Sequence, residues 1–405
     1  MEVSLNRLPE DRQRLAILGA TGSIGRSTLD LVRQHPDRFE VVAISAHQDD
    51  QGLLRLVQEF HPRMVCLSDK SAAARLREAL ALTPHREIVE LAGPEGLCEL
   101  VSIAEVDTVV AGIVGVAGLP SVWQAVAAGK RVLLANKEAL VCAGGLLVSA
   151  ARASGATILP IDSEHNAIFQ ALGTGYRCFE RPEDVHRILL TASGGPFRQW
   201  PIEKMALATV EEAIAHPNWS MGRKISVDSA TMANKGLEWI EAHWLFAMAP
   251  EEIEIVVHPE SLIHSMVEFV DGSTLAQLGP PDMRTPIAHA LAWPARITSG
   301  VTRLDWRSIQ ALHFERPDPI RFPALSHVAA CLQSGQAAAN VFNAANEQAV
   351  DAFLGSRIRF GQIQELVGDV LSEMAGRLTE PSCLEDVVGL DGEARRHADA
   401  WLMNQ

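Results

Sequence analysis

Short apolar runs alternate with helix-like segments through the first 161 residues, and this alternation restricts the fold more than any other feature. The runs occupy residues 15–18, 41–44, 64–67, 108–110, 132–134 and 157–159. Runs of this length, separated by connecting segments, are typical of strands in a buried parallel sheet. Residues 71–82 carry five alanines and three leucines among charged residues and predict one of the connecting helices. The sequence therefore predicts an α/β fold that begins with a parallel sheet.

The first apolar run leads directly into a glycine-rich turn, Gly19-Ala-Thr-Gly-Ser-Ile-Gly25, and then into helix-compatible residues 26–33. Glycines let the backbone turn tightly and approach a pyrophosphate, whose charge is met by N–H groups at the start of the helix. Thr21 and Ser23 add hydroxyl donors. A glycine triplet alone would equally fit a plain strand-to-helix turn. Its place at the head of the strand series favours a dinucleotide site.

The composition excludes several classes of protein. A chain of 405 residues exceeds the usual size of one hydrophobic core, so we expect more than one domain. The formal charge of -15 would repel a phosphate backbone, which argues against a nucleic-acid partner. The six cysteines include no CxxC pair, as is usual for reduced thiols, and we find neither a signal peptide nor a membrane-spanning stretch. A cytoplasmic protein without a membrane partner is expected.

Motif density and composition divide the chain into four segments. Residues 1–161 hold the strand series, and residues 162–296, rich in Gly, Ser, His and Trp, are interpreted as the catalytic domain. Prolines recur from Pro286 to Pro323 and favour an extended linker, which we place at residues 297–324. Residues 325–405 are rich in Ala, Leu, Glu and Gln and predict a small helical bundle.

Two carboxylates follow the last run of the strand series, at Asp162 and Glu164. If the strand persists, both side chains point to the same side, where their charges repel. A divalent cation would relieve this repulsion, and ligation by oxygen alone favours Mg²⁺ or Mn²⁺ over Zn²⁺. Glu238, in the polar segment Asn234-Lys-Gly-Leu-Glu238, is a candidate third ligand. A surface pair of acids without a metal is the plainer alternative.

Several side chains near these carboxylates are donors of the kinds that hold a phosphate group. They are Ser193, Ser229, Asn234 and Lys235. Helix capping and turn formation are the alternative roles for such residues.

A lid is predicted between these motifs, where Trp219 and Met221 stand beside Pro217 and Gly222. Apolar side chains in a turn-rich segment suit a mobile loop that covers a substrate, although a packed loop with Trp219 in the core would explain the same residues. His258 and His264 lie in an apolar run and are expected to be structural or to face the substrate rather than to bind metal.

The glycine-rich turn, the string Asp162-Ser-Glu-His-Asn-Ala-Ile-Phe169 and the segment Asn234-Lys-Gly-Leu-Glu238 resemble, in their order along the chain, the signatures of the 1-deoxy-D-xylulose 5-phosphate reductoisomerase family. The similar strings also include Ala135-Asn-Lys-Glu138, His216-Pro-Asn-Trp-Ser-Met-Gly-Arg-Lys224 and Pro281-Asp-Met-Arg-Thr-Pro-Ile287. The resemblance implies a Rossmann-like NADPH domain, a central α/β (α+β) catalytic domain, a C-terminal helical bundle and a homodimer. It also implies a metal-assisted rearrangement of the sugar phosphate and its reduction to 2-C-methyl-D-erythritol 4-phosphate, in non-mevalonate isoprenoid synthesis.

The resemblance further implies a role for each matching residue. The metal ligands would be Asp162, Glu164 and Glu238. The residues nearest the chemistry would be Lys137, Glu164, His216 and His264. Substrate would contact Ser163, Ser193, His216, Trp219, Ser229, Asn234, Lys235 and Glu238, with Met221 also in the lid. NADPH would contact Thr21, Gly22, Ser23, Ile24, His47, Gln48, Asp49, Asn136, Glu138 and Gly222.

The turn after the second strand departs from what this family leads us to expect. It reads Ala46-His-Gln-Asp-Asp50, where a basic or small polar turn would welcome the 2′-phosphate of NADPH. Carboxylates there would repel that phosphate, whereas His47 and Gln48 could donate hydrogen bonds to it. We expect NADPH to be preferred over NADH, but by a narrower margin than a lysine or arginine in this turn would give.

Two other functions stay open from the residues alone. Another two-domain NAD(P)-dependent dehydrogenase would need a nucleophilic cysteine, and the one cysteine of the catalytic segment, Cys178, is not in a nucleophile-like setting. A non-catalytic NADPH sensor would leave the carboxylates at Asp162, Glu164 and Glu238 without a role.

Overall fold

The computed structural model describes residues 12–215, 219 and 222–404. Two compact units emerge from the spatial contacts. The first comprises Met1–Asn136, Ala150–Asp162 and Met283–Val301, and the second comprises Lys137–Ser149, Ser163–Asp282 and Thr302–Gln405. Because these units follow contacts rather than function, their limits differ from those of the four segments inferred above, which stay a prediction.

A seven-stranded parallel sheet forms the core of the first unit, in the order β4-β3-β2-β1-β5-β6-β7. Its strands are β1 (Gln13–Leu18), β2 (Phe39–Ala46), β3 (Met64–Leu67), β4 (Val89–Ala92), β5 (Thr108–Ala111), β6 (Arg131–Leu134) and β7 (Thr157–Pro160). All six predicted strands are confirmed. Strand β4, at the edge of the sheet, was not predicted, because its four residues Val-Glu-Leu-Ala are exposed or half-buried and Glu90 interrupts the apolar run.

Helices connect these strands as the βαβ pattern requires. They are α1 (Ser23–Gln34), α2 (Asp50–Phe60), α3 (Lys70–Ala81), α4 (Gly93–Ser102), the 3₁₀ turn η1 (Val116–Gly118), α5 (Leu119–Ala127) and, between β6 and β7, α6 (Lys137–Ser154). The helix predicted over residues 71–82 is confirmed as α3. Leu29, Leu31 and Val32 of α1 are buried, so apolar burial holds this helix in the unit behind the glycine-rich turn.

Helix α12 (Arg284–Ala292) also belongs to the first unit and packs on α1, β6 and β7. It contains Pro286, so the assignment of that proline to an extended segment was wrong. Pro286 lies in the first turn, where a missing backbone N–H costs the helix nothing. Residues 293–322 contain no helix or strand longer than an isolated bridge at Glu315, in keeping with an extended connection.

The second unit contains a four-stranded mixed sheet in the order β11-β10-β8-β9. Its strands are β8 (Val185–Ala192), β9 (Ile253–Val257), β10 (Ile263–Phe269) and β11 (Thr274–Leu278). The helices and 3₁₀ turn around it are α6 (Lys137–Ser154, which extends beyond this unit), α7 (Ser163–Leu172), α8 (Ile202–Met205), α9 (Val210–Ile214), α10 (Arg223–Ala230), α11 (Ala233–Phe246) and η2 (Pro250–Glu252). Helix α7 packs on β10 and β11.

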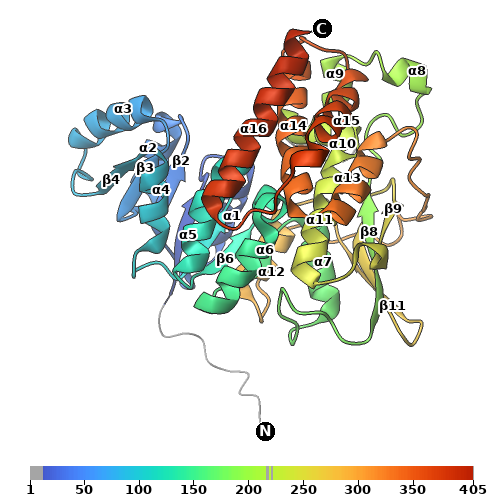
Figure 1. The fold of residues 1–405 in the computed structure, drawn as a ribbon. Coiled ribbons are helices and arrows are strands. Elements are labelled where there is room, and N and C mark those ends of the chain that lie inside the picture. The colour runs from blue at the N-terminus through green and yellow to red at the C-terminus, as the bar shows by residue number, and fades with distance from the viewer. Residues whose placement is uncertain (1–11, 216–218, 220–221, 405) are drawn as a thin grey trace. The chain divides into compact units, whose positions relative to one another are not determined.

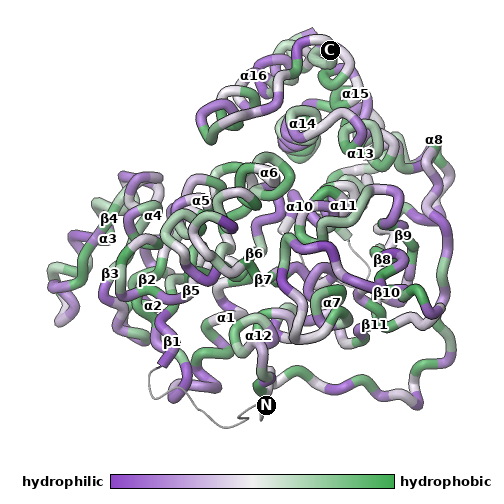
Figure 2. The backbone as a smooth tube through the Cα atoms, turned by 60° about the horizontal axis from the view of Figure 1, so that its bottom comes forward, coloured by the Kyte–Doolittle hydropathy of each residue, from purple (hydrophilic) through white to green (hydrophobic). Residues whose placement is uncertain are grey.

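The predicted helical bundle is confirmed at the C-terminal end of the second unit. It consists of α13 (Pro323–Ser334), α14 (Gln336–Leu354), α15 (Gln362–Met374), the 3₁₀ turn η3 (Ala375–Arg377) and α16 (Leu384–Met403). Helix α14 packs against the three other helices and is buried along most of its length (Figure 1). Hydrophilic and hydrophobic stretches alternate along α16, as expected for a helix with one face on the bundle (Figure 2).

Among the helices that the structure describes, none combines the length and the apolar character needed to cross a membrane.

Candidate active site

The acidic pair lies where strand β7 gives way to helix α7, and the local geometry differs from the prediction. Strand β7 ends at Pro160, and α7 begins at Ser163, so Glu164 occupies the first turn of a helix. The assumption that the strand persists to Glu164 was wrong. A carboxylate in the first turn is favoured by the helix dipole, which explains the early start of α7. The ligand atoms of Asp162, Glu164 and Glu238 nevertheless lie within 4.8 Å of one another.

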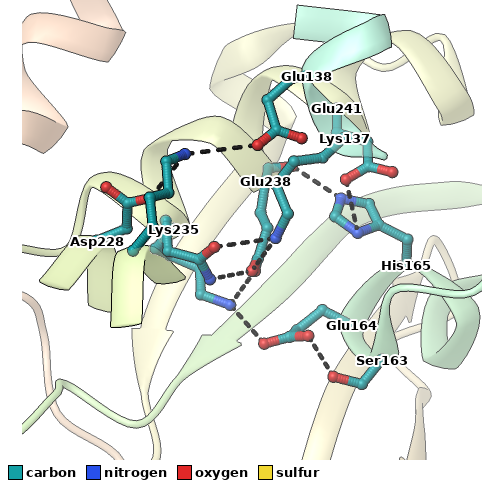
Figure 3. A network of polar contacts seen from close by, with 11 residues as sticks. Lys137, Glu138, Ser163, Glu164, His165, Asp228, Lys235, Glu238 and Glu241 are labelled. Carbon is teal, nitrogen blue, oxygen red and sulfur yellow. Dashed lines mark hydrogen bonds and ion pairs between the residues drawn. The ribbon is translucent and has the colours of Figure 1, made fainter. Parts of the chain in front are cut away.

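Helix α11 supplies the polar groups that face Glu164. Asn234 and Glu238 are one turn apart and therefore share a face, and the amide of Asn234 donates to Glu238. The ammonium nitrogen of Lys235 lies 2.7 Å from Oε1 of Glu164 and also contacts Glu238 (Figure 3). The Lys137 ammonium, from the start of α6, donates to Asn234 Oδ1 at 3.0 Å and to Glu238 Oε1 at 3.0 Å.

Burial and charge together decide the protonation of Lys235 in this cluster. Glu238 is 1% exposed and Lys235 is 4% exposed. Burial alone would lower the pKa of Lys235, but the carboxylates of Glu164 and Glu238 outweigh burial, and the pKa is raised. Lys235 therefore carries its charge. Counted at formal charge, three carboxylates and two ammonium groups sum to one negative charge, and the oxygen-only ligand set of the carboxylates fits Mg²⁺ or Mn²⁺.

A second pair of titratable side chains lies behind the carboxylates and was missed by the sequence analysis. His165 and Glu241 are both fully buried, with Nδ1 of the histidine 3.4 Å from a Glu241 oxygen. The Nε2 atom of His165 lies 2.8 Å from the backbone carbonyl oxygen of Glu238. Since His165 follows Glu164 and Glu241 comes three residues after Glu238, this pair ties α7 to α11. The three-residue spacing of Glu238 and Glu241, which places both on one face of a helix, is the sequence signal that could have indicated this pair.

The candidate phosphate donors come from two neighbouring segments. Ser193 follows β8, and its hydroxyl accepts a hydrogen bond from the N–H of Gly195 at 3.2 Å. Gly195 adopts φ 66°, and a Cβ atom there would lie 2.6 Å from the carbonyl oxygen of Ser229 at the end of α10. The turn after β8 therefore lies against the end of α10, which brings the segments of Ser193 and Ser229 together. Lys235 instead faces the carboxylates.

The described part of the predicted lid consists of Trp219 and Gly222. The Trp219 ring is 6.0 Å from the ring of His264, at an angle of 60°. His264 is buried, with Nε2 3.1 Å from the carbonyl oxygen of Gly279, and burial lowers its pKa, which favours the neutral imidazole. Gly222 is the N-cap of α10. The predicted His216 and Met221 lie outside the described residues.

Beyond the lid, Lys224 anchors the start of α10. Its ammonium contacts Asp228 at 2.9 Å and Glu138 at 3.5 Å. Asp228 is 1% exposed and accepts a hydrogen bond from Asn346 of α14 at 2.7 Å. Glu138, for which the resemblance implied a contact with NADPH, therefore contacts Lys224 at the start of α10. Although Lys224 ends the string from His216 to Lys224, the sequence did not indicate the roles of Lys224 and Asp228, because these depend on Glu138 and Asn346, which are remote in sequence.

In the first unit, the glycine-rich turn has the predicted strand–turn–helix geometry. Gly19 adopts φ 71°, and a Cβ atom there would lie 2.9 Å from the carbonyl oxygen of Gly112. Helix α1 begins at Ser23 with Gly22 as N-cap, a residue with no side chain to occupy the first N–H groups. Asn136 donates to the carbonyl oxygens of Ile113 at 2.6 Å and Gly115 at 2.8 Å, which holds a neighbouring loop. The turn fits a pyrophosphate.

Asp49 and Asp50, the two carboxylates in the turn after β2, each have a partner within the first unit. Asp49 caps α2 by accepting from the N–H of Gly52 at 2.8 Å. Asp50 pairs with Arg75 of α3 at 2.8 Å, and this hydrogen bond lowers the pKa of the Asp50 carboxyl. The ring of His47 lies 2.7 Å from the hydroxyl of Ser68, and Gln48 is exposed.

A parallel sheet that opens on such a turn, together with a cluster of carboxylates and ammonium groups, defines a dinucleotide-binding α/β enzyme class. Family models described as 1-deoxy-D-xylulose 5-phosphate reductoisomerase, its C-terminal domain and the DXP reductoisomerase C-terminal domain match residues 15–144, 158–246 and 278–397. The chain belongs to the 1-deoxy-D-xylulose 5-phosphate reductoisomerase family, which confirms the resemblance seen in the motifs.

Relatives and solved structures of this family match nearly the whole length of this chain. The reductoisomerase of Aromatoleum aromaticum is 55% identical, covering 98% of this chain and 97% of its own, and one from Pseudomonas aeruginosa is 54% identical over 96% and 98%. A crystal structure of DOX-P reductoisomerase with NADPH, fosmidomycin and magnesium has a TM-score of 0.91 at 46% identity, covering 96% of this chain and 98% of that one. The Zymomonas mobilis enzyme with NADPH has a TM-score of 0.88 at 46% identity, with 97% and 99% coverage.

Proposed function

We propose that this chain converts 1-deoxy-D-xylulose 5-phosphate into 2-C-methyl-D-erythritol 4-phosphate with NADPH and a divalent metal, as a step of non-mevalonate isoprenoid synthesis. The carboxylate cluster around Glu164 and Glu238, bridged by Lys235 in a chain of this family, carries the proposal. A cysteine-dependent dehydrogenase is disfavoured, because burial raises the pKa of the Cys178 thiol and keeps it protonated.

Asp162, Glu164 and Glu238 would hold the metal. When bound, Mg²⁺ or Mn²⁺ acts as a Lewis acid on the ketone and the neighbouring hydroxyl of the sugar phosphate. Lys137 donates hydrogen bonds from a fixed position, because Asn234 and Glu238 both hold its ammonium. In the proposed role this ammonium would stabilise negative charge on a substrate oxygen.

Substrate binding would use the turn after β8 and the ends of α10 and α11. Ser193, Ser229 and Asn234 offer hydroxyl and amide donors there and would hold the phosphate, with Lys235 adding positive charge from the cluster side. Ser163 lies beside Glu164, to which its hydroxyl donates at 2.6 Å, and would reach a substrate hydroxyl. These assignments rest on donor chemistry and on the position of the segments.

The other side of the substrate would be covered by the lid. His264 is buried and favoured in its neutral form, so it can exchange a hydrogen bond without adding charge. Trp219 lies beside it and would exclude water when the lid closes. His216 would join them in the same lid.

NADPH would bind at the glycine-rich turn of the first unit. The N–H groups at the start of α1 would receive the pyrophosphate, with Thr21 and Ser23 adding hydroxyls beside Gly22 and Ile24. Bound NADPH supplies the hydride for the reduction. His47 and Gln48 would meet the 2′-phosphate, and the Asp49 carboxylate is directed to its own helix by capping.

A homodimer is the proposed assembly, and the cytoplasm is the proposed location. Support for the dimer comes from β11, the edge strand of the four-stranded sheet. Its residues Thr274, Leu275 and Ala276 are exposed, as is Val270 in the preceding turn. An exposed edge with apolar side chains is a usual place for a second chain to pair. Light scattering of the purified protein should give twice the chain mass.

One assay separates the proposed function from its alternatives. The purified protein is mixed with NADPH and 1-deoxy-D-xylulose 5-phosphate, with and without Mg²⁺ after treatment with a chelator, and the product is identified by mass spectrometry. Metal-dependent NADPH oxidation with formation of the branched product supports the proposal. Metal-independent oxidation would indicate another dehydrogenase, and NADPH binding without turnover would indicate a sensor.

A further inference from the structure

Helix α6, which begins with Lys137, is interrupted at Ala143, where φ is -138° and ψ is 27°. In an uninterrupted helix the N–H of Gly145 donates to the carbonyl oxygen of Val141, four residues earlier. Here the side-chain amide of Gln336, the first residue of α14, serves both groups. Its Oε1 accepts from the Gly145 N–H at 3.2 Å, and its Nε2 donates to the Val141 carbonyl oxygen.

The surroundings of this amide leave little room for water to take its place. Val141 and Ala143 are completely buried, and Gln336 is 9% exposed. Trp244 of α11 packs against the same bend, since a Cβ atom on Gly144 would lie 2.5 Å from the indole ring. Buried backbone groups need a hydrogen-bond partner, and in this bend the partner is a side chain from the C-terminal bundle.

We propose that Gln336 is a positioning residue that sets the bend of α6 and, through it, the position of the Lys137 ammonium. Without the amide, the buried carbonyl oxygen of Val141 and the N–H of Gly145 lose their partner, and the bend of α6 is no longer held at one angle. Lys137 lies six residues before Ala143, about 9 Å along the helix axis. A change in bend of about 10° would then move the start of α6 by roughly 1.5 Å. That shift is half the length of the 3.0 Å hydrogen bonds from Lys137 to Asn234 and Glu238, so it is large enough to break them.

The inference rests on the proposed function, because it assumes that Lys137 serves the reaction. The test compares Gln336→Leu, which keeps the size but removes both hydrogen bonds, with Gln348→Leu on the same helix. Gln348 donates to Asp399 instead of to α6 and serves as the matched control. Three measurements are made: steady-state kinetics for the sugar phosphate (kcat and KM), NADPH affinity by fluorescence titration, and amide hydrogen exchange over residues 137–149.

For Gln336→Leu we expect kcat to fall about tenfold or more, because a displacement of about 1 Å can cost up to about 100-fold. NADPH affinity should stay within about twofold of the wild type, since the glycine-rich turn belongs to the other unit. Exchange should accelerate in residues 137–145. The Gln348→Leu protein should match the wild type in all three measurements.

Wild-type kcat in a folded Gln336→Leu protein would overturn the inference, as would a loss of kcat without faster exchange in α6. If that variant does not fold, Gln336→Asn keeps the amide but is one methylene shorter, so the amide no longer reaches both Val141 and Gly145, and this variant should also show lower kcat with faster exchange. A wild type that does not convert the sugar phosphate would refute the proposed function, while the exchange data would still decide the role of Gln336 in α6.

Discussion

The ammonium of Lys235 lies 2.7 Å from the carboxylate of Glu164, although 71 residues separate them in the chain. This contact joins α11 to α7 and fixes how far Glu164 stands from Glu238, which Lys235 also contacts. The charge of Lys235 is retained in a buried site only because both carboxylates face it. Replacing Glu164 or Glu238 should therefore perturb the site more than replacing an exposed residue would.

Replacement of Glu238 by glutamine should lower turnover by more than about 100-fold, since even outer partners of a metal site cost about 10- to 100-fold. NADPH affinity should stay within about twofold, because the glycine-rich turn lies in the other unit. Activity and fluorescence titration measure the two effects, with circular dichroism to verify folding. Glu251→Gln, an exposed acid, is the control. Near-normal turnover in folded Glu238→Gln would remove Glu238 from the metal site.

Truncation of Trp219 to alanine should raise KM for the sugar phosphate and lower kcat, because the reacting centre would stay in contact with water. The half-buried ring beside His264 places it at the proposed substrate side. Steady-state kinetics and thermal unfolding are measured together, with Trp306→Ala, 65% exposed, as control. A large fall in melting temperature with unchanged kinetics would show that Trp219 is a core residue and that the lid proposal fails.

Acid should destabilise the first unit through His289 of α12. Burial lowers the pKa of this histidine from 6.5 to about 4. Between these values the unfolded chain binds a proton that the folded chain does not, so the free energy of unfolding falls as pH drops. The loss between pH 7 and pH 5 should be up to about 2 kcal/mol.

Denaturant unfolding at both pH values tests this, comparing wild type with His289→Gln and with His186→Gln. The side chain of His186 is 63% exposed and serves as the control. The His289→Gln protein should lose less stability on acidification than the other two. Equal losses in all three proteins would show that His289 does not contribute.

Substitution of Asp49 by asparagine should widen the preference for NADPH over NADH. Asparagine can still cap α2 by accepting from Gly52, as Asp49 does, so the fold is kept. Removing the charge should favour the 2′-phosphate by roughly two- to fivefold, from a Coulomb energy of about 1 kcal/mol or less between exposed charges. Fluorescence titration gives both affinities. Asp271→Asn, in an exposed turn of the other unit, is the control and should leave the ratio of the two affinities unchanged. An unchanged ratio in Asp49→Asn would show that the 2′-phosphate binds elsewhere.

Local sequence determined the elements whose signals lie within a few residues. The apolar run at residues 15–18 and the glycines after it specify β1, the turn and α1, because strand burial and left-handed backbone are short-range demands. The same holds for α3 and for the helices of the bundle. The order of the polar strings was also sufficient to indicate the family before any distance was known.

Tertiary structure decided what depends on partners far along the chain. Strand β4 pairs with the edge of β3, although Glu90 interrupts the apolar residues of this segment. Glu164 reaches Glu238 from a helix rather than a strand, and Gln336 enters the bend of α6 across 195 residues. Hydrogen bonds and ion pairs of this kind gain their strength from burial, and burial is a property of the folded chain. Periodicity can predict which residues are polar, but only packing determines which of them meet.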